Sequence, residues 1–413
     1  MSSPNASDMR QEADSGLVPK LRFQEFWATG EWKVKEIGSY LTESRITGSK
    51  GDTARKITVK LWGNGVSEKK ETSPGSANTQ YFRRRAGQFI YSKLDFLNQA
   101  FGIIPSWLDG YESTIDLPCF DIADGLHPCF LLNYVKRREF YERAGEAADG
   151  SRKAKRIQSD TFLGCPIALP SLAEQQKIAD CLTSIDELIT AQARKVDALK
   201  THKQGMMQQL FPREGETQPR LRFPEFQNAG EWTMKPLGMV AVNLDNKRRP
   251  ITSTNREAGE TPYYGASGIV DYVKGYIFEE DLLCVSEDGA NLVARTYPVA
   301  FSISGRTWVN NHAHVLRFKH TCTQKFVEAY LNSINLMDFI TGMAQPKLNK
   351  AMLDSIPIPH TTVPEQERIS TCLIRLDDLI TAEITKLETL KTYKEGLMRQ
   401  LFPSEEATTP WPT

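Results

Sequence analysis

Two groups of side chains in this sequence have the chemistry to bind nucleic acid. Cationic side chains bind phosphate oxygens, and asparagine offers the donor and acceptor pair that matches adenine. The candidates are Arg83, Arg84, Arg85 and Lys93 in the first half of the chain, and Lys247, Arg248, Arg249, Asn310, Asn311 and His312 in the second. Taken alone, the arginine cluster fits a solvated surface equally well, and the asparagine-histidine group is better explained as a turn capped by its own side chains.

Other polar residues do not form a catalytic or metal-binding pattern. His312 and His314 lack a flanking cluster of cysteines or carboxylates, so we expect structural histidines and no metal site. Glu287 and Asp288 are adjacent, but no basic residue stands at the spacing of a nuclease. Neither a GxxxxGK[ST] phosphate loop nor the glycine-rich loop and Asn/Asp-Pro-Pro-aromatic motif of DNA aminomethyltransferases occurs. The residues therefore favour a recognition module over an enzyme.

The candidates lie in two dissimilar inserts, approximately 33–166 and 233–355, in which short strands and turns are expected. A repeated frame surrounds them. The sequences PKLRFQEFWATGEW from Pro19 and PRLRFPEFQNAGEW from Pro219 are offset by 200 residues. Each half then ends in a long helical pattern, and the two patterns, which close at Pro212 and Pro403, are offset by 191 residues. The sequence has been duplicated, and only the inserts have diverged.

Apolar residues in both long helices follow the 4-3 spacing of a coiled coil, interrupted by polar residues at equivalent positions. The predicted seam residues are Ile185, Ile189, Gln192, Val196, Leu199, Lys203, Met206 and Leu210 in the first helix, and Leu376, Ile380, Glu383, Leu387, Leu390, Lys394, Leu397 and Leu401 in the second. An antiparallel register that pairs Lys203 with Glu383 and Gln192 with Lys394 matches every polar gap. A parallel pair would set Lys203 against Lys394, a like-charge contact. We therefore predict an intramolecular antiparallel pair with a pseudo-twofold axis, which would act as a rigid spacer.

Composition is that of an ordinary globular protein of 413 residues, 40% hydrophobic and 25% charged. Residues 20–166 contain 23 Lys and Arg residues against 18 Asp and Glu residues, a net charge of +5, whereas residues 220–355 have 15 against 14. Seven cysteines without a CxxC pair argue against disulfides and a cysteine zinc site. We expect no signal peptide, no membrane span and a cytoplasmic location.

The predicted fold class is mixed α/β, with two globular inserts joined by an antiparallel coiled coil. The expected segments are a polar N-terminal tail at 1–18, a first recognition domain at 19–166, a first spacer helix at 167–212, a linker at 213–219, a second recognition domain at 220–355, a second spacer helix at 356–403 and a disordered tail at 404–413.

The repeated motifs resemble the specificity subunit of type I restriction–modification systems (HsdS family). The resemblance rests on LPSLAEQQKIADCLTSIDELI with QGMMQQLFP, on VPEQERISTCLIRLDDLI with EGLMRQLFP, on the two opening motifs and on AQPKLNKAMLDSIPIP at 344–359. It covers nearly the whole chain. Before its Glu-Gln pair the first copy has Ser171-Leu172-Ala173 where the second has Val363-Pro364, a minor departure.

The resemblance implies a non-catalytic DNA-recognition subunit of a bacterial or archaeal host-defence system. Each insert would be a target recognition domain that reads one half of a bipartite, asymmetric site in double-stranded DNA, and the helix pair would be a ruler. Two methyltransferase subunits and the restriction/translocase subunits would dock on the helices and on Gly342–Asn349. S-adenosylmethionine, ATP and Mg²⁺ would be used by these partners, with no cofactor bound by this chain. The alternative is a protein-binding scaffold without DNA specificity.

Overall fold

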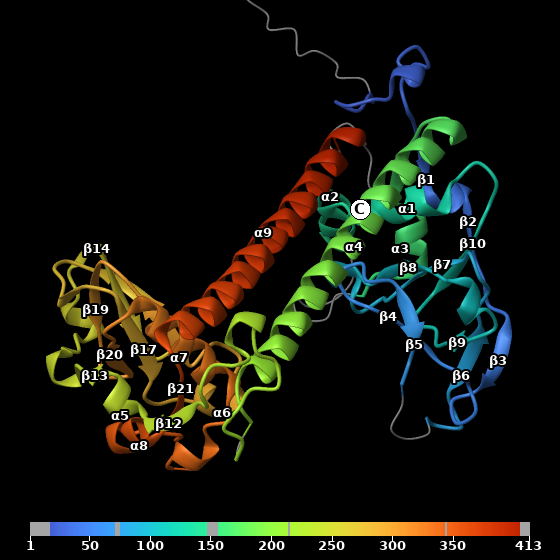
Figure 1. Cartoon of the computed structure of the whole chain (residues 1–413). Coiled ribbons are helices and arrows are strands. Elements are labelled where there is room, and N and C mark those ends of the chain that lie inside the picture. Colours follow the sequence, from blue (N-terminus) through green and yellow to red (C-terminus); the bar gives the residue numbers. More distant parts are fainter. Residues whose placement is uncertain (1–16, 71–74, 147–155, 214, 343–344, 405–413) are drawn as a thin grey trace, which may run out of the picture. The chain divides into compact units, whose positions relative to one another are not determined.

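The computed structural model describes residues 17–70, 75–146, 156–213, 215–342 and 345–404 (Figure 1). The chain forms two compact units: unit 1 comprises 1–191 and 387–413, and unit 2 comprises 192–386. Each unit therefore combines one insert with part of each long helix, whereas the segments expected from the sequence treat each helix as a segment of its own. Most of both expected tails, at 1–16 and 405–413, lies outside the described residues.

The two long helices are α4 (Leu172–Leu210) and α9 (Val363–Leu401), each of 39 residues. Each has a glutamate in its first turn, where a negative charge is favoured by the helix dipole. Each is followed by Phe-Pro, and the residue before a proline is disfavoured in the helical conformation. The expected mixed α/β fold with two long helices is confirmed. No helix in the described ranges is long and apolar enough to cross a membrane.

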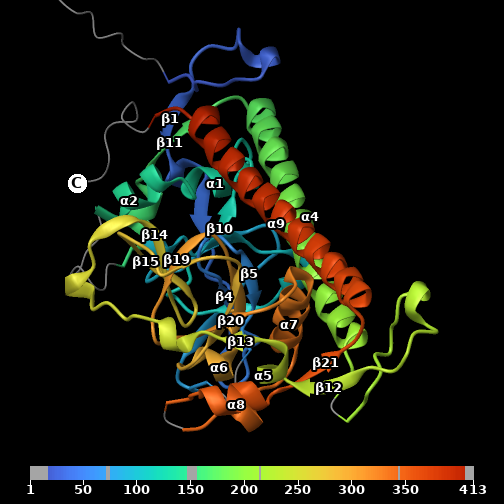
Figure 2. The ribbon, with the colours of Figure 1, turned by 60° about the vertical axis from the view of Figure 1, so that its left-hand side comes forward.

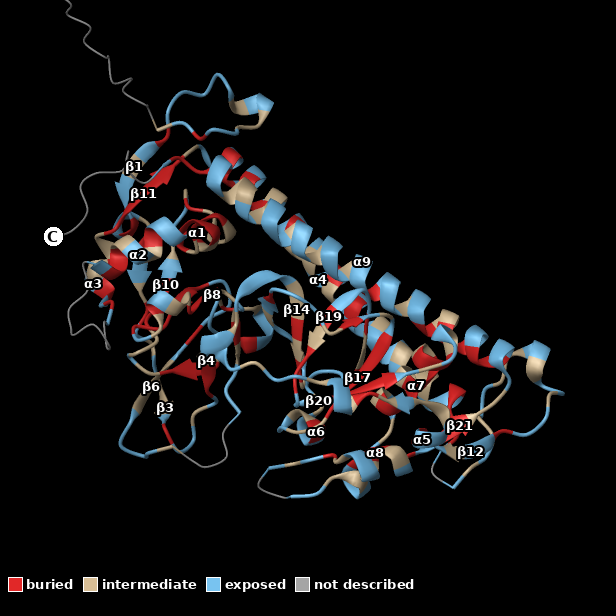
Figure 3. Ribbon diagram, turned by 90° about the vertical axis from the view of Figure 1, so that its left-hand side faces the viewer, coloured by how far each residue is buried: buried red, intermediate tan, exposed pale blue. Residues whose placement is uncertain are grey.

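The helices lie side by side along the predicted seam (Figure 2). Every predicted seam residue is buried or half-buried, whereas most of the face of α9 that is visible in Figure 3 is exposed. This burial matches the face that the 4-3 spacing of the apolar residues predicts.

The predicted register of the pair is wrong. In unit 2, the Gln192 amide donates 2.6 Å to the Glu383 carboxylate, and Lys203 pairs with Asp377 at 2.5 Å. In unit 1, Lys394 pairs with Asp186 at 2.6 Å. Gln192 and Glu383 are equivalent residues of the repeat, and so are the two Lys–Asp pairs. Gln192 therefore meets its own equivalent, and each lysine bonds to an aspartate beside the seam instead of to a polar residue in the seam.

The insert of unit 1 is built from short antiparallel strands. These are β1 (Lys33–Glu36), β2 (Leu41–Glu43), β3 (Thr47–Lys50), β4 (Ile57–Val59), β5 (Val66–Glu68), β6 (Gln80–Arg83), β7 (Phe89–Tyr91), β8 (Phe101–Ile103), β9 (Glu112–Ser113), β10 (Cys119–Ile122) and β11 (Pro166–Leu169). They form a four-stranded sheet in the order β2-β10-β7-β8, a three-stranded sheet β3-β6-β9, and the pairs β4-β5 and β1-β11. Figure 1 places β3, β6 and β9 at the opposite end of the unit from β1.

The core of unit 1 is rich in aromatic rings. It lies between the four-stranded sheet and the helices α1 (Pro128–Val135), α2 (Arg138–Glu146) and α3 (Ser159–Leu163). Phe89 stacks on Phe162 at 5.4 Å, and Tyr91 stacks on Phe120 at 5.9 Å. Each fully buried ring of this kind contributes about 1.5–3 kcal/mol of transfer free energy, so this core is a stable support for the exposed loops.

Unit 2 has a different arrangement of strands around its own core. Its strands are β12 (Thr233–Pro236), β13 (Val242–Asn243), β14 (Ala258–Gly265), β15 (Gly268–Val273), β16 (Phe278–Glu279), β17 (Leu282–Ser286), β18 (Ala300–Ile303), β19 (Arg306–Val309), β20 (Ala313–Arg317) and β21 (Pro357–His360). They form the sheets β13-β20-β17-β18 and β15-β14-β19-β16, with β14 and β19 parallel, and the pair β12-β21. Its short helices are α5 (Leu237–Val240), α6 (Asn291–Ala294), α7 (Thr321–Ser333) and α8 (Lys350–Ser355).

The repeated motifs make the same contacts in both units. In unit 1, Arg22 forms two 2.7 Å hydrogen bonds to the buried carboxylate of Glu174, and the Trp32 indole donates to it at 3.3 Å. Arg222 and Trp232 bind Glu365 in the same way in unit 2. The strand after each opening motif pairs with the strand before each long helix, β1 with β11 and β12 with β21. These contacts join the opening motif of each half to the start of its own long helix.

The far ends of the long helices are also buried, each in the unit of the other half of the sequence. Leu401, the last residue of the second helix, and Phe402 lie in the core of unit 1, where Phe402 contacts Phe130 at 5.4 Å. Phe211, after the first helix, contacts Phe326 in the core of unit 2 at 5.1 Å. The repeated Leu-Phe-Pro therefore anchors a helix end.

Candidate nucleic-acid interface

The positive charge of unit 1 is concentrated in residues 45–85. This segment contains ten Lys and Arg residues against three Asp and Glu residues, a net charge of +7. Eight of the ten are exposed, since only Lys56 and Arg84 are buried. The exposed cations lie on or beside the strands β3 to β6, and they include the predicted Arg83 and Arg85. Such a surface favours a polyanionic partner.

Arg84 and Lys93 do not belong to this surface, which corrects their assignment to phosphate contact. Arg84 is 2% exposed, and its guanidinium donates to Ser113 Oγ at 2.8 Å and to the Ser44 carbonyl oxygen at 2.7 Å. Burial lowers the pKa of Arg84. Lys93 is 8% exposed. Since successive side chains at a strand point to opposite sides, three consecutive arginines cannot share one face, and Arg83 and Arg85 point out while Arg84 points in.

Exposed tryptophans accompany the basic segment, and sequence reasoning missed them. Trp62 is 63% exposed in the loop between β4 and β5, and Trp107 is 61% exposed in a short 3-10 helix, Ser106–Leu108. The Gly110 amide donates to the Arg84 carbonyl oxygen at 2.8 Å, and the Ala86 amide donates to Asp109 at 2.8 Å. These bonds place Trp107 beside the loop that carries Arg85. Both Trp107 and Arg85 are exposed, and an exposed indole is a side chain on which a base can stack.

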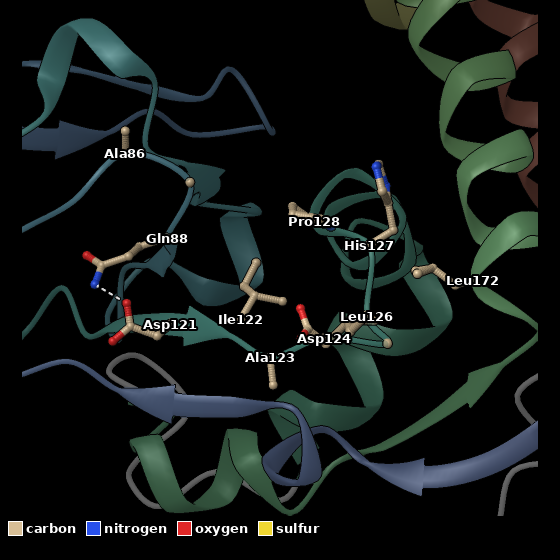
Figure 4. Close-up of a pocket in the computed structure, with 12 residues that line it drawn as sticks. Ala86, Gln88, Asp121, Ile122, Ala123, Asp124, Leu126, His127, Pro128 and Leu172 are labelled. Carbon is tan, nitrogen blue, oxygen red and sulfur yellow. Dashed lines mark hydrogen bonds between the residues drawn. The ribbon is translucent and has the colours of Figure 1, made fainter.

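A pocket of about 390 Å³ lies behind the same loop (Figure 4). Gln88 donates 2.7 Å to Asp121 on one side, and Asp124 and His127 stand on the other. Burial lowers the pKa of His127, and the negative charge of Asp180 partly offsets this shift. Because two carboxylates line it, the pocket would repel a phosphate, and we do not include it in the basic surface.

In unit 2, the structure brings the two predicted groups together. Arg248 donates 2.6 Å to Glu287, and the Glu287 amide donates 2.9 Å to the His312 carbonyl oxygen. The loop after β13 and the turn between β19 and β20 therefore meet at one end of the sheet β13-β20-β17-β18. The exposed side chains there are Lys247, Arg249, Asn311 and His312.

Arg248 and Asn310 have internal roles instead of the predicted DNA contacts. Arg248 is held between Glu287 and the Ala313 carbonyl oxygen, at 2.6 and 2.8 Å. Asn310 is 7% exposed, and its side-chain oxygen accepts a 2.8 Å hydrogen bond from the His312 amide, as expected of a self-capped turn. His312 itself is exposed and pairs with Asp288 at 2.8 Å. The surface thus offers two cations, an amide and an imidazole.

Beneath this surface lies a polar cluster of the half-buried Asp245 and Glu287 and the buried His314, whose possible ligand atoms lie within 4.8 Å of one another. Both ring nitrogens of His314 face acceptors, Asp245 at 2.6 Å and the Leu348 carbonyl oxygen at 2.7 Å. Arg248 contributes a fixed positive charge to both carboxylates. Since a cationic side chain of the protein already occupies this site, the cluster is better explained as a structural network. That this chain holds no metal stays a prediction.

The stretch Gly342–Asn349, expected to dock a partner, borders the same end of unit 2, although its residues 343–344 lie outside the described part. The Leu348 amide donates to the Glu287 carbonyl oxygen at 2.7 Å, and Lys347 pairs with Glu287 at 3.3 Å. This stretch is therefore part of the wall of the polar cluster. Of the basic run 152–156, only Arg156 is described; it is exposed and pairs with Asp116 at 3.4 Å.

Comparison with known protein families identifies a match in the second half of the chain. Residues 229–392 match the model of the type I restriction modification DNA specificity domain. A protein of Haemophilus influenzae named as a type I restriction enzyme specificity subunit is 38% identical over 152 residues, which are 37% of each chain. A protein of Methanocaldococcus jannaschii named as the type I restriction enzyme MjaX specificity subunit is 25% identical over 287 residues, 66% of each. The chain thus spans about a third and about two thirds of the lengths of these relatives.

Solved structures share the fold over nearly the whole chain. A crystal structure of a type I restriction-modification S subunit from M. genitalium has a TM-score of 0.60 and 15% identity, covering 94% of this chain and 100% of that one. A chain from a study of complex assembly and conformational transition in a type I R-M system has a TM-score of 0.57 and 15% identity, with 91% and 98% covered. At this identity the likeness shows a common architecture.

Proposed function

We infer that this chain belongs to the family of the specificity subunits of type I restriction–modification systems, and we derive its function from that family. The chain recognises a bipartite, asymmetric sequence in double-stranded DNA, with one half-site read by each insert. One observation carries this proposal: the two units repeat the same frame, with Arg22 on Glu174 and Arg222 on Glu365, around inserts of different strand order. Two different inserts held by the same repeated frame suit two different half-sites.

The surfaces of the two inserts support contact with DNA. Unit 1 offers eight exposed cations in a segment of net charge +7, next to an exposed indole. Unit 2 offers Lys247 and Arg249 for phosphates, and Asn311 and His312 for base edges. A scaffold for protein clients, the alternative function, would need neither this charge nor these polar side chains, so we do not favour it.

The catalytic work belongs to partner subunits under this proposal. Two methyltransferase subunits would methylate adenine with S-adenosylmethionine, and restriction/translocase subunits would use ATP and Mg²⁺, in the cytoplasm. The exposed faces of α4 and α9, and the surface around Lys347, are the proposed docking sites. This chain would bind none of the cofactors itself.

Expression with the neighbouring methyltransferase subunit in a methylation-free host tests the proposal. Long-read sequencing of the host genome should reveal modified adenines in a split, asymmetric motif, and the modification should vanish when this chain is omitted. Modification that persists unchanged without this chain would contradict the proposal and favour the scaffold. A complex that neither methylates nor binds any DNA sequence preferentially would contradict it as well.

A further inference from the structure

The loop between β4 and β5 presents large apolar side chains to solvent at its tip. Leu61 is 40% exposed and Trp62 is 63% exposed. In the described part of the chain, no acceptor takes a hydrogen bond from the Trp62 indole. Burying an indole stabilises a protein strongly, so two adjacent apolar side chains left in water at the tip of one loop suit contact with a partner.

The backbone at this tip is strained. Trp62 has a φ of 59°, and Gln99, in the neighbouring turn, has a φ of 53°. Residues other than glycine are rare in this left-handed region, and strain of this kind concentrates at functional sites. Two such residues side by side require the surrounding structure to hold them.

Three hydrogen bonds hold the tip in its strained form. The Trp62 amide donates to the Asn98 carbonyl oxygen at 2.7 Å, and the Gly63 amide donates to the Gln99 carbonyl oxygen at 2.9 Å. The half-buried Lys136 ammonium donates to the Gly63 carbonyl oxygen at 3.0 Å. The tip is therefore presented in a fixed direction, and little conformational entropy would be lost when it meets a ligand.

Charge around the tip identifies the class of ligand. Lys60 precedes the tip, and Lys69 and Lys70 follow β5; all three are exposed. They belong to the segment of net charge +7, which would attract a polyanion. Nucleic acid combines that negative charge with aromatic faces and base steps, into which proteins insert apolar wedges.

We propose that Leu61 and Trp62 form a wedge that stacks against a base of the half-site read by unit 1. The indole contacts the base face, and Lys60 contacts the adjoining phosphate. This inference rests on the proposed function and adds to it a specific aromatic contact. The strain at Trp62 is the cost of directing the indole outward, so removal of the side chain should relieve strain and weaken binding at the same time.

Trp62→Gly is the sharpest test, because glycine adopts a φ of 59° without strain. The complex of the full chain with its methyltransferase subunit would be titrated with the duplex identified by methylation mapping, and Kd measured by fluorescence anisotropy. We expect Trp62→Gly to raise the melting temperature of unit 1 by roughly 2–4 °C. We expect its affinity to fall about tenfold to a hundredfold, the loss of one stacked base. Trp62→Phe should retain most of the affinity.

Trp27 supplies the matched control, since it is 68% exposed in unit 1 but lies outside the insert. Trp27→Ala should bind the duplex like the unmodified protein. If Trp62→Gly also binds like the unmodified protein, the wedge is wrong. If it binds DNA normally but no longer co-purifies with the methyltransferase, the tip is a protein-docking site and the wedge is again wrong. If the unmodified complex itself shows no preference for the duplex, the proposed function fails, and the wedge fails with it.

Discussion

Arg22 and Glu174 form a contact that recurs between the two equivalent residues in the second half of the chain. Their side chains are 7% and 1% exposed, so both charges are desolvated and depend on each other. The Trp32 indole completes the contact with a 3.3 Å hydrogen bond. The opening motif LRF…GEW and the Glu-Gln motif, far apart in the sequence, are therefore two parts of one clasp.

Removing the carboxylate of this clasp should destabilise unit 1 severely. In Glu174→Ala the Arg22 guanidinium loses two hydrogen bonds, and we expect a loss of about 3–5 kcal/mol in the free energy of unfolding, measured by urea denaturation. Glu25→Ala, which breaks an exposed pair with Lys177 in the same motif, should change stability little. Equal effects of the two variants would contradict the assignment of the clasp.

Acid should destabilise unit 2 through Asp245. Burial alone would raise the pKa of Asp245, but hydrogen bonds from His314 and the Val315 amide, with the charge of Arg248, lower it below its ordinary value. A pKa that is lower in the folded state gives stability that is present above about pH 4, the ordinary pKa of aspartate, and that is lost as the pH falls through the folded-state pKa. Unfolding followed by hydrogen exchange should show this loss, and Asp245→Asn should remove this part of the pH dependence. An Asn variant with an unchanged acid transition would exclude Asp245 as its source.

The structure gives an internal role to some of the predicted site residues and leaves the others as predictions, for physical reasons. Arg83, Arg85, Lys247, Arg249, Asn311 and His312 are exposed, as a binding role requires. Arg84 and Arg248 are internal, because an arginine can satisfy buried carbonyl or carboxylate oxygens as well as phosphates. The alternation of side chains at the end of β6 could have separated Arg84 from its neighbours. The left-handed φ of Trp62 had no sequence signal, since glycine is the residue normally expected there.

At the scale of elements, the helix pair illustrates which property of a coiled coil a sequence specifies strongly. The sustained 4-3 spacing identified both helices and the buried face. The register was wrong because it was chosen to pair polar gaps in the seam with each other. Lysine side chains are long enough to extend out of the seam, and they reach Asp377 and Asp186 beside it. The sequence pattern does not specify which acidic side chain each lysine contacts.

A charge exchange distinguishes the two registers. Lys203→Glu should place a negative charge against Asp377 and lower the free energy of unfolding of unit 2 by about 0.5–1 kcal/mol, a modest effect because the pair is partly exposed. Adding Asp377→Lys should restore most of the loss, which a double-mutant cycle in urea would measure. Rescue by Glu383→Lys instead would favour the register expected from the sequence.

At the scale of the whole molecule, duplication explains why each unit is self-contained. The helix end in each core comes from the other half of the sequence, Phe402 in unit 1 and Phe211 in unit 2. The Lys–Asp pairs also lie within single units, Lys394 with Asp186 and Lys203 with Asp377. The frame could be read from the sequence because it occurs twice, whereas the folds of the inserts could not, since each occurs once and is built from strands of eight residues or fewer.

Because these contacts lie within single units, the helix pair, the proposed ruler, can be lengthened without disturbing either insert. Four residues inserted after Gln192 and four after Glu383 would add about one turn, roughly 6 Å, to each helix near the boundary between the units, and leave the outer Lys–Asp pairs in place. Since base pairs are stacked about 3.4 Å apart, we expect both half-sites to be unchanged and the gap between them to grow by about two base pairs, as mapped by genome-wide adenine methylation. An insertion in one helix alone should instead unpair the seam and abolish methylation. An unchanged gap in the doubly extended protein, with its helical content intact by circular dichroism, would rule out the helices as the element that sets the spacing.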